Sequence, residues 1–292
     1  MSSATSLGGA WRVRLADGAE VVAKRHGAPS GVLAEVAGLR WLASAGSPGS
    51  GTGTGAASGP PESSLAVRTD SAGAREVGCP QVLAHDDEWL VVESVAGGRP
   101  SPAAAERLGR GLADLHRSGA AAFGSPPPGG PVDAWIGLAP MRNVTGDAWP
   151  AWYAEHRLLP YLRTADLPGR DAIDAVCDRI AELAGPAEPP ARLHGDLWNG
   201  NVLWAADGRA WLIDPAAHGG HRETDLAMLA LFGCPHLDRV LAAYHEVSPL
   251  SDGWRARVPL HQLFPLLVHT VLFGGGYGAQ AVAAANAALS GL

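Results

Sequence analysis

The sequence predicts an α+β fold in which a strand-rich N-terminal part precedes a helix-rich C-terminal part. Short runs that are rich in β-branched and aromatic residues and separated by turns occupy the first part, which is typical of antiparallel strands. Further along, apolar residues recur every three or four positions, which is typical of amphipathic helices. The change falls near residue 95, so we expect one lobe at 1–95 and a second at 96–292.

Four strands are expected in the N-terminal lobe, at residues 11–15, 20–24, 80–83 and 88–93. The first two flank Asp17-Gly18, a dipeptide common in hairpin turns. A helix is expected at 31–43, where Val32 and Val36 fall on one face.

Residues 44–76 have a different composition, dominated by Gly, Ser, Thr, Ala and Pro. Such a segment offers too little apolar surface to offset the entropy of ordering the chain. We therefore predict a mobile insertion within the N-terminal lobe, with little regular structure.

The C-terminal lobe is expected to hold helices at residues 103–116, 149–163, 170–184, 224–232, 236–246, 254–273 and 279–289. The longest apolar stretch, 260–273, is interrupted by Pro265 and His269 and is too short to span a membrane. No signal peptide is visible at the start. These features favour a cytoplasmic protein without a membrane partner.

Composition excludes several classes of protein. The formal net charge is −7 and no long Lys/Arg run occurs, so a nucleic-acid partner is disfavoured. Cys79, Cys177 and Cys234 are odd in number and widely spaced, which argues against a disulfide framework or a CxxC metal site. The eleven histidines show no metal-ligand spacing along the sequence. The negative charge suits a cationic substrate.

The most informative segment is His194-Gly195-Asp196-Leu197-Trp198-Asn199-Gly200-Asn201. It fits the His-x-Asp-x-x-x-x-Asn catalytic loop of kinase-like phosphotransferases. Phosphoryl transfer needs a carboxylate to orient and deprotonate the attacking hydroxyl, and oxygen ligands for the metal ion on the phosphates. Asp196 is the candidate base, and Asn201 is a candidate metal ligand.

A hairpin is expected directly after this loop, with strands up to Trp204 and from Ala210 around Asp207-Gly208. If Asp207 and Gly208 are the two loop residues, Asn201 faces Asp214 across the hairpin. Opposite residues in such a pair stand ~5 Å apart. The expected hairpin therefore places an amide and a carboxylate on one magnesium ion.

Nucleotide-binding residues are expected in the N-terminal lobe. Lys24 ends the strand Val21-Val22-Ala23-Lys24, close to the Val-Ala-Ile-Lys pattern of kinases. It would contact phosphates, held by Glu35 on the next helix. Residues Glu93, Ser94 and Val95 follow a strand and precede the helical lobe, so they are the candidate hinge for adenine.

Three more residues are candidates for supporting roles. Trp198 is either a wall for the substrate or a packing residue of the loop. His194 is expected to support the loop structurally. Asp225, at a helix start, is expected to cap that helix, to brace the catalytic loop, or to do both.

Together these residues resemble the fructosamine kinase (ketosamine kinase) family, within the aminoglycoside phosphotransferase-like group. The resembling segments are residues 135–137, 142–143, 194–201, 213–216, 219–228, 231–233, 249–250 and 272–277. Two features depart from the family pattern. The Gly-containing turn before Trp11 is short, spanning only Ser6 to Ala10, and the insertion between Leu42 and Pro80 is unusual.

The resemblance implies a two-lobed protein-kinase-like fold and transfer of a phosphoryl group from ATP, with Mg²⁺, to a sugar hydroxyl of an amine-bearing adduct. An aminoglycoside- or choline-type kinase is the alternative, because the group shares its catalytic residues. A non-catalytic nucleotide-binding pseudokinase is a second alternative, supported by the short turn. A protein kinase is excluded, because residues 214–222 leave no room for an activation segment.

Overall fold

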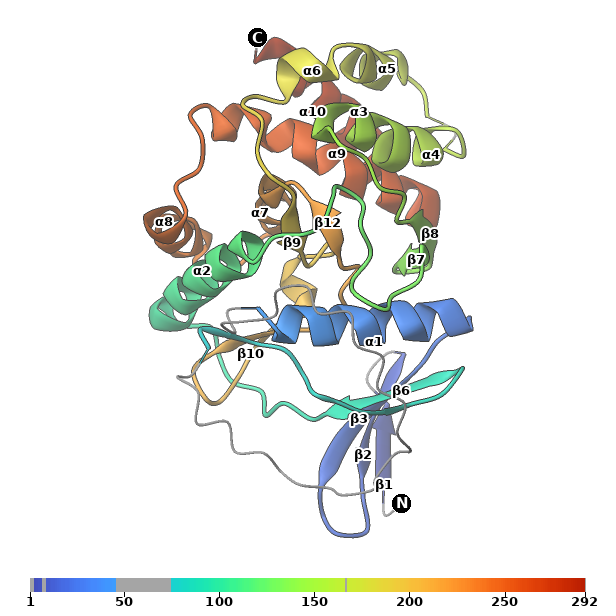
Figure 1. The fold of residues 1–292 in the computed structure, drawn as a ribbon, viewed down its shortest axis with the longest axis vertical. Helices are drawn as coiled ribbons and strands as arrows, with labels where there is room; N and C mark the ends of the chain where they lie inside the picture. The colour runs from blue at the N-terminus through green and yellow to red at the C-terminus, as the bar shows by residue number, and fades with distance from the viewer. Residues whose placement is uncertain (1–2, 7–8, 46–74, 166, 292) are drawn as a thin grey trace.

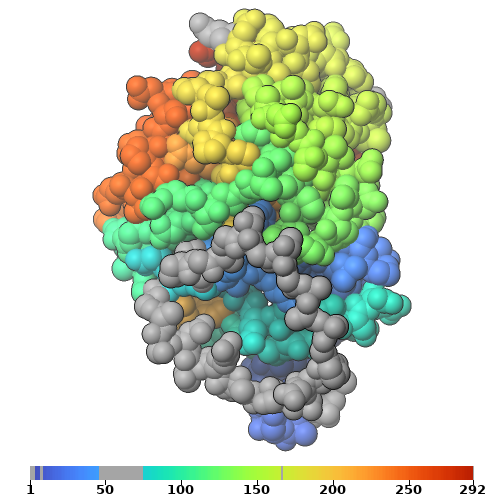
Figure 2. All heavy atoms as spheres, viewed as in Figure 1, coloured from blue at the N-terminus to red at the C-terminus, as the bar shows by residue number. Residues whose placement is uncertain are grey.

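The computed structural model describes residues 3–6, 9–45, 75–165 and 167–291. An antiparallel sheet lies at the N-terminal end of the molecule, and most helices gather at the other end (Figure 1). Figure 2 shows most of the later part of the chain, coloured green to red, above the blue and cyan N-terminal part. The predicted α+β fold is therefore confirmed. The lobe boundary near residue 95 stays a prediction.

The N-terminal sheet has five strands in the order β1-β2-β3-β6-β5. Their bounds are β1 (Ser3–Ser6), β2 (Ala10–Arg14), β3 (Glu20–Arg25), β5 (Val82–His85) and β6 (Trp89–Glu93). The sequence had not predicted β1. Ser6 pairs with Trp11, so β1 and β2 form a hairpin around residues 7–10, of which 7 and 8 lie outside the described residues.

Helix α1 (Pro29–Ala43) runs between the sheet and the C-terminal helices (Figure 1). Pro29 at its first position is favourable there, because that amide has no helical partner in any case. Val32, Val36 and Leu39 of α1 pack against Leu90 of β6. This small apolar cluster fixes the helix, and with it Glu35, over the strand that carries Lys24.

The predicted insertion falls mostly outside the described residues, but its ends are packed. Glu76 forms ion pairs with Arg107 at 3.1 Å and Arg110 at 3.0 Å. The Oγ of Ser44 accepts a hydrogen bond from Arg192 at 3.0 Å. Strand β4 (Val77–Gly78) then pairs in parallel with Ala210 and Trp211. These two residues belong to the hairpin that follows the catalytic loop, which we call the catalytic hairpin. The predicted limits of 44 and 76 were therefore too wide.

The C-terminal helices are α2 (Pro102–Arg117), α3 (Trp149–Tyr153), α4 (Leu159–Leu162), α5 (Asp171–Asp178), α6 (Ile180–Leu183), α7 (Arg222–Phe232), α8 (Leu237–Val247), α9 (Trp254–Phe273) and α10 (Tyr277–Ser290). The helix predicted at 149–163 contains a π-helical turn, Ala154–Leu158, before α4. Pro160 lacks an amide proton, which prevents a regular ladder there. The helix predicted at 170–184 is two helices, broken at Arg179.

Four short strands in the C-terminal part escaped prediction because they are only three or four residues long: β7 (Asp133–Ile136), β8 (Ala139–Arg142), β9 (Ala191–Leu193) and β12 (His218–Gly220). β7 and β8 form a hairpin beside α1, where the Trp135 indole donates a hydrogen bond to Ser30 at 3.0 Å. This hairpin therefore joins the C-terminal part to the start of α1. β9 leads directly into the catalytic loop and pairs with β12.

The register predicted for the catalytic hairpin was wrong by one residue. In β10 (Val202–Trp204) and β11 (Ala210–Leu212), Val202 pairs with Leu212 instead of Ile213. The loop holds three residues, because Ala205 donates its amide hydrogen to the Arg209 carbonyl. Gly208 adopts a φ of 77°, as three-residue hairpin loops require at this position. Asn201 consequently lies opposite Ile213, and Asp214 falls beyond the pairing.

Two large apolar clusters form the core of the C-terminal part, one around α3, α4, α9 and α10 and one around α2, α7 and α8. The second cluster includes Leu197 of the catalytic loop together with Val202 and Leu212 of the hairpin. These buried side chains therefore anchor the loop and the hairpin to the core. Among the helices that the structure describes, none has the length and apolar character needed to cross a membrane.

Candidate active site

The predicted catalytic loop places Asp196 and Asn201 in direct contact. The Asn201 amide nitrogen donates hydrogen bonds to the Asp196 backbone carbonyl at 2.9 Å and to its Oδ2 at 3.0 Å. The short 3₁₀ turn Asn199–Asn201 brings the two side chains together. Because the nitrogen makes both bonds, the Asn201 Oδ1 is the atom that can bind a metal ion.

Burial raises the pKa of Asp196 to about 7. The hydrogen bond from Asn201 opposes this shift, whereas the negative charges of Asp214 and Asp225 reinforce it. A carboxyl group with a pKa near the working pH is suited to general-base catalysis, because it is both ionised and a better proton acceptor than an exposed aspartate.

Lys24, Glu35 and Asp214 form an ion-pair network next to the catalytic loop. The Lys24 ammonium lies 2.9 Å from a Glu35 oxygen and 3.0 Å from Asp214 Oδ1. Burial disfavours the charge on Lys24, but these two carboxylates raise its pKa overall. The end of β3 and the middle of α1 thus meet Asp214, the second residue beyond β11 (Ala210–Leu212). The contact between Lys24 and Glu35 is the one that the sequence had predicted.

Asp214 has a backbone conformation that is uncommon for a residue other than glycine, with a φ of 53°. Its side chain is 45% exposed. Asp214, Asn201 and Asp196 all line one cavity of about 460 Å³. A carboxylate and an amide oxygen are hard oxygen donors of the kind that Mg²⁺ prefers, so this donor set fits a magnesium ion.

Asp225 and His194 connect the catalytic loop to the elements behind it. Asp225 accepts the backbone N–H groups of His194 at 2.8 Å and Gly195 at 3.0 Å. The His194 Nε2 donates to the Ile213 carbonyl at 2.9 Å, which ties the loop to the hairpin. The cap of α7 is His221, which accepts the Glu223 N–H, so Asp225 braces the loop instead of capping the helix.

Both supporting groups are held in one protonation state. Burial lowers the pKa of His194, which keeps the ring neutral. For Asp225, burial opposes ionisation, but the hydrogen bonds with His116 and with the Gly195 N–H lower its pKa. A buried carboxylate that accepts several N–H groups is a rigid anchor.

Trp198 lines the same cavity and is 40% exposed. Its ring covers Gly200, where any side chain would collide with the indole. The ring edge also meets Phe232 at a centroid distance of 6.3 Å. Trp198 is therefore packed on one side and open to the cavity on the other, so both predicted roles are compatible with its position.

The predicted hinge residues Glu93, Ser94 and Val95 lie half-buried at the end of β6. Burial raises the pKa of Glu93. The chain just beyond them is bonded to the catalytic hairpin, since the Ala206 N–H donates to the Ala96 carbonyl at 2.9 Å. The hinge segment and the hairpin thus adjoin, although a contact with adenine stays a prediction.

Sequence reasoning missed two histidines at this site. His26 Nε2 lies 3.0 Å from Glu35 Oε2, the same oxygen that Lys24 contacts. His116 Nε2 lies 3.2 Å from Asp225. The position of His26, two residues after Lys24, gave a weak signal, whereas the contact of His116 spans 109 positions in sequence and gave none.

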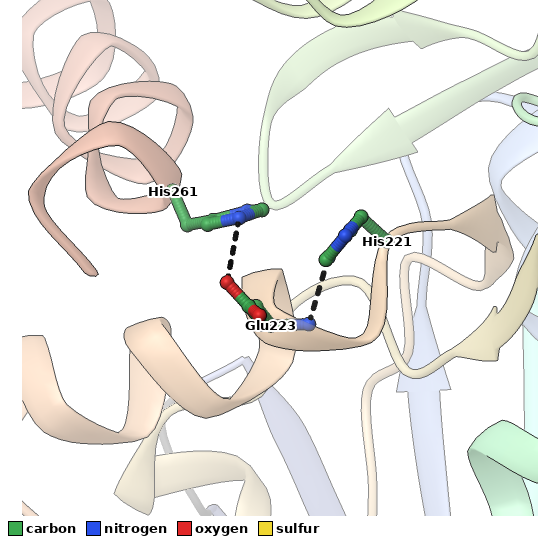
Figure 3. A group of neighbouring side chains, drawn as sticks. All are labelled: His221, Glu223 and His261. Carbon is green, nitrogen blue, oxygen red and sulfur yellow. Dashed lines mark hydrogen bonds and ion pairs between the residues drawn. The ribbon is translucent and has the colours of Figure 1, made fainter. Parts of the chain in front are cut away.

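A second group of titratable side chains lies buried at the start of α7 and in α9. Figure 3 shows His221, Glu223 and His261, which have the types and proximity of metal ligands. Arg257 already pairs with both Glu223 oxygens, at 2.6 and 3.0 Å. Its positive charge opposes a divalent cation, and the rings of His221 and His261 pack on Trp149. We interpret the group as a structural clasp between the helices.

The fold assigns the chain to a class of proteins. It is similar to the solved structure of the aminoglycoside phosphotransferase APH(4)-Ia, with a TM-score of 0.62 over 99% of this chain and 93% of that chain. The identity is 14%, so this likeness concerns the fold alone. The class is that of proteins with a protein-kinase-like fold.

Within that class, the sequence pattern of the fructosamine kinase family matches residues 70–290. The chain belongs to the fructosamine kinase family. It is similar to a candidate fructosamine-3-kinase from Thermobifida fusca YX-ER1, with 45% identity and a TM-score of 0.82 over 99% of this chain and 94% of that chain.

A probable ketoamine kinase of Synechocystis sp. is 38% identical over 196 residues. These residues make up 66% of this chain and 65% of the relative, slightly less than two thirds of its length.

Proposed function

We propose that the protein is an ATP-dependent kinase that phosphorylates a sugar hydroxyl of a ketosamine, the adduct of a sugar with an amine. Family membership supports the kind of acceptor. The observation that carries the proposal is the shared cavity, in which Asp196, Asn201, Asp214 and Lys24 lie around one space. General base, metal ligands and phosphate-binding cation are the parts that phosphoryl transfer requires.

Asp196 acts as the base in this proposal. It accepts the proton of the sugar hydroxyl, whose oxygen forms the new bond to the γ-phosphorus while the bond to the departing ADP breaks. The hydrogen bond from Asn201 fixes the orientation of the carboxylate. Asp225, His194 and their backbone partners keep the loop in place and are positioning residues.

Asn201 and Asp214 would hold magnesium, which supplies charge neutralisation at the phosphates when bound. Lys24 would bind the α- and β-phosphates, since Glu35 directs its ammonium into the cavity. Glu93, Ser94 and Val95 would present backbone groups to adenine.

The substrate assignment is the step that needs an experiment most. ATP consumption should be measured with fructosyl-lysine, ribulosyl-lysine, kanamycin and choline side by side, and the phosphorylated product identified by mass spectrometry. We expect turnover on ketosamines to exceed that on kanamycin and choline by orders of magnitude. Equal or greater turnover on kanamycin or choline would refute the assignment, and no turnover on any acceptor would favour the pseudokinase.

A further inference from the structure

Three large apolar side chains stand exposed around the opening of the candidate active site. They are Leu138 in the β7–β8 turn, Trp198 in the catalytic loop and Phe273 at the end of α9, with exposed fractions of 83%, 40% and 66%. Exposed apolar side chains that occur singly need no explanation, but a group at a cleft is typical of a binding surface. We call these three side chains the apolar rim.

The members of the apolar rim come from three separate elements and are linked through intermediate side chains. Leu138 and Trp198 line the same 460 Å³ cavity as Asp196. Trp198 contacts Phe232, which lies 4.7 Å from the His269 ring, and His269 lies 5.3 Å from the Phe273 ring. The α9 end also adjoins the β7–β8 turn, since Leu272 lies 3.7 Å from a Cβ placed on Gly137.

The charged groups of the cavity favour one orientation of a cationic substrate. Lys24 and Arg25 line the side formed by β3, and both are already paired, Lys24 with Glu35 and Asp214, and Arg25 with Glu88. The carboxylates there are engaged: Glu35 and Asp214 pair with Lys24, and Asp196 accepts a hydrogen bond from Asn201.

Trp135 and Trp198 also line the cavity, and the faces of aromatic rings attract cations. An ammonium group is therefore most favourably placed beside Trp198, with its substituent leading outward along the apolar rim.

We propose that the apolar rim binds the nitrogen substituent of the ketosamine, so that the protein prefers adducts of amines with an aliphatic or aromatic arm to adducts of short amines. This inference rests on the proposed function. A ketosamine with its sugar hydroxyl at Asp196 must direct the remainder of the amine out of the cavity. Burial of that arm against exposed rings removes apolar surface from water on both partners.

The test keeps the sugar constant and varies the amine. The values of kcat/KM are measured for fructosyl adducts of methylamine, hexylamine and benzylamine. We expect the wild-type protein to favour the hexyl and benzyl adducts over the methyl adduct by about 10-fold or more, since each buried methylene contributes up to about 4-fold. In Phe273→Ala and Leu138→Ala, the hexyl and benzyl values should fall about 3- to 10-fold, with the methyl value unchanged.

Leu83→Ala is the matched control, because Leu83 is 44% exposed on β5 and outside the cavity lining. It should leave all three values unchanged. Equal wild-type values for the three adducts would overturn the inference, as would an equal loss on all adducts in both rim variants with unchanged melting temperature. In either case turnover on the methyl adduct would still support the proposed function. No turnover on any adduct would refute the proposed function, and this inference with it.

Discussion

At the scale of single residues, the carboxyl group of Asp196 connects the structure to a measurable pH dependence. Burial raises its pKa to about 7, against the hydrogen bond from Asn201. Below this pH the group is mostly protonated and cannot accept a proton from a hydroxyl. Above it the group is ionised, so activity that depends on the base is lost on acidification and is present on the alkaline side.

We therefore expect kcat/KM for a ketosamine to rise as the pH increases from about 5.5 and to level off at about 8, since this profile reports the base in the free enzyme. Nucleotide binding measured over the same pH range is the control, because Asp196 is not assigned to it. A flat kcat/KM between these limits would contradict the role of Asp196 as a base with a raised pKa.

The sequence predicted those site residues whose partners are close along the chain or belong to a known pattern. Asp196 and Asn201 are five positions apart in one loop, and Lys24 and Glu35 follow a strand–helix spacing. The contact of His116 with Asp225 depends on how α2 packs near α7, which no local pattern encodes. The clasp of His221 with His261 was missed for the same reason.

At the scale of elements, the catalytic hairpin depends on its loop geometry. The sequence predicted the hairpin but not its register, because Asp-Gly is compatible with both two- and three-residue loops. Gly208 adopts a φ of 77° with no atom near the position of a Cβ, so a substitution there tests backbone strain without a steric clash.

Gly208→Ala should lower the free energy of unfolding by about 1 kcal/mol, because alanine disfavours the left-handed region. Gly97→Ala is the matched control, since Gly97 also has open space around it but no positive φ. Urea unfolding of both variants gives the comparison. Equal effects of the two substitutions would argue against the left-handed conformation of Gly208.

Helix α7 contributes Asp225 to the site, where its carboxylate holds the catalytic loop through two backbone N–H groups. A matched pair of variants can separate this role from the general effect of an acidic residue near the start of a helix. Asp225→Asn should lower kcat strongly, because the amide can no longer accept both loop N–H groups while it faces His116. Asp238→Asn, in the first turn of α8, removes an exposed carboxylate from a similar helix position and should leave kcat unchanged. If both variants retain full kcat at a temperature where each is folded, the brace is unnecessary for activity.

At the scale of the whole molecule, composition and periodicity were sufficient to predict the α+β fold and most helices. The long periodic segment of α2 buries one continuous face, so its pattern is strong. The strands β7, β8, β9 and β12 are too short to show a period, and tertiary contacts define them. The cytoplasmic location stays a prediction.

The role of the insertion can be tested by deleting it, and the packed residues at its two ends set the limits of the deletion. Residues 47–73 should be replaceable by a short Gly/Ser linker with little change in melting temperature or turnover, because their composition offers little apolar surface. Ser44 and Glu76 are kept, since they contact Arg192, Arg107 and Arg110. A large loss of either property would show that the segment packs or participates.

The measurement that tests the central claim most directly compares Asp196→Asn with the wild type on one ketosamine. The amide preserves the shape of the side chain but cannot act as a base. Turnover should fall by ~10²- to 10⁴-fold, while ATP affinity, assigned to Lys24, the hinge and the metal ligands, should change little. With chemistry rate-limiting, kcat and kcat/KM should fall together. Asp147→Asn, an exposed carboxylate outside the cavity lining, is the control. Retention of more than about a tenth of wild-type turnover by Asp196→Asn would contradict the assignment of Asp196 as the catalytic base.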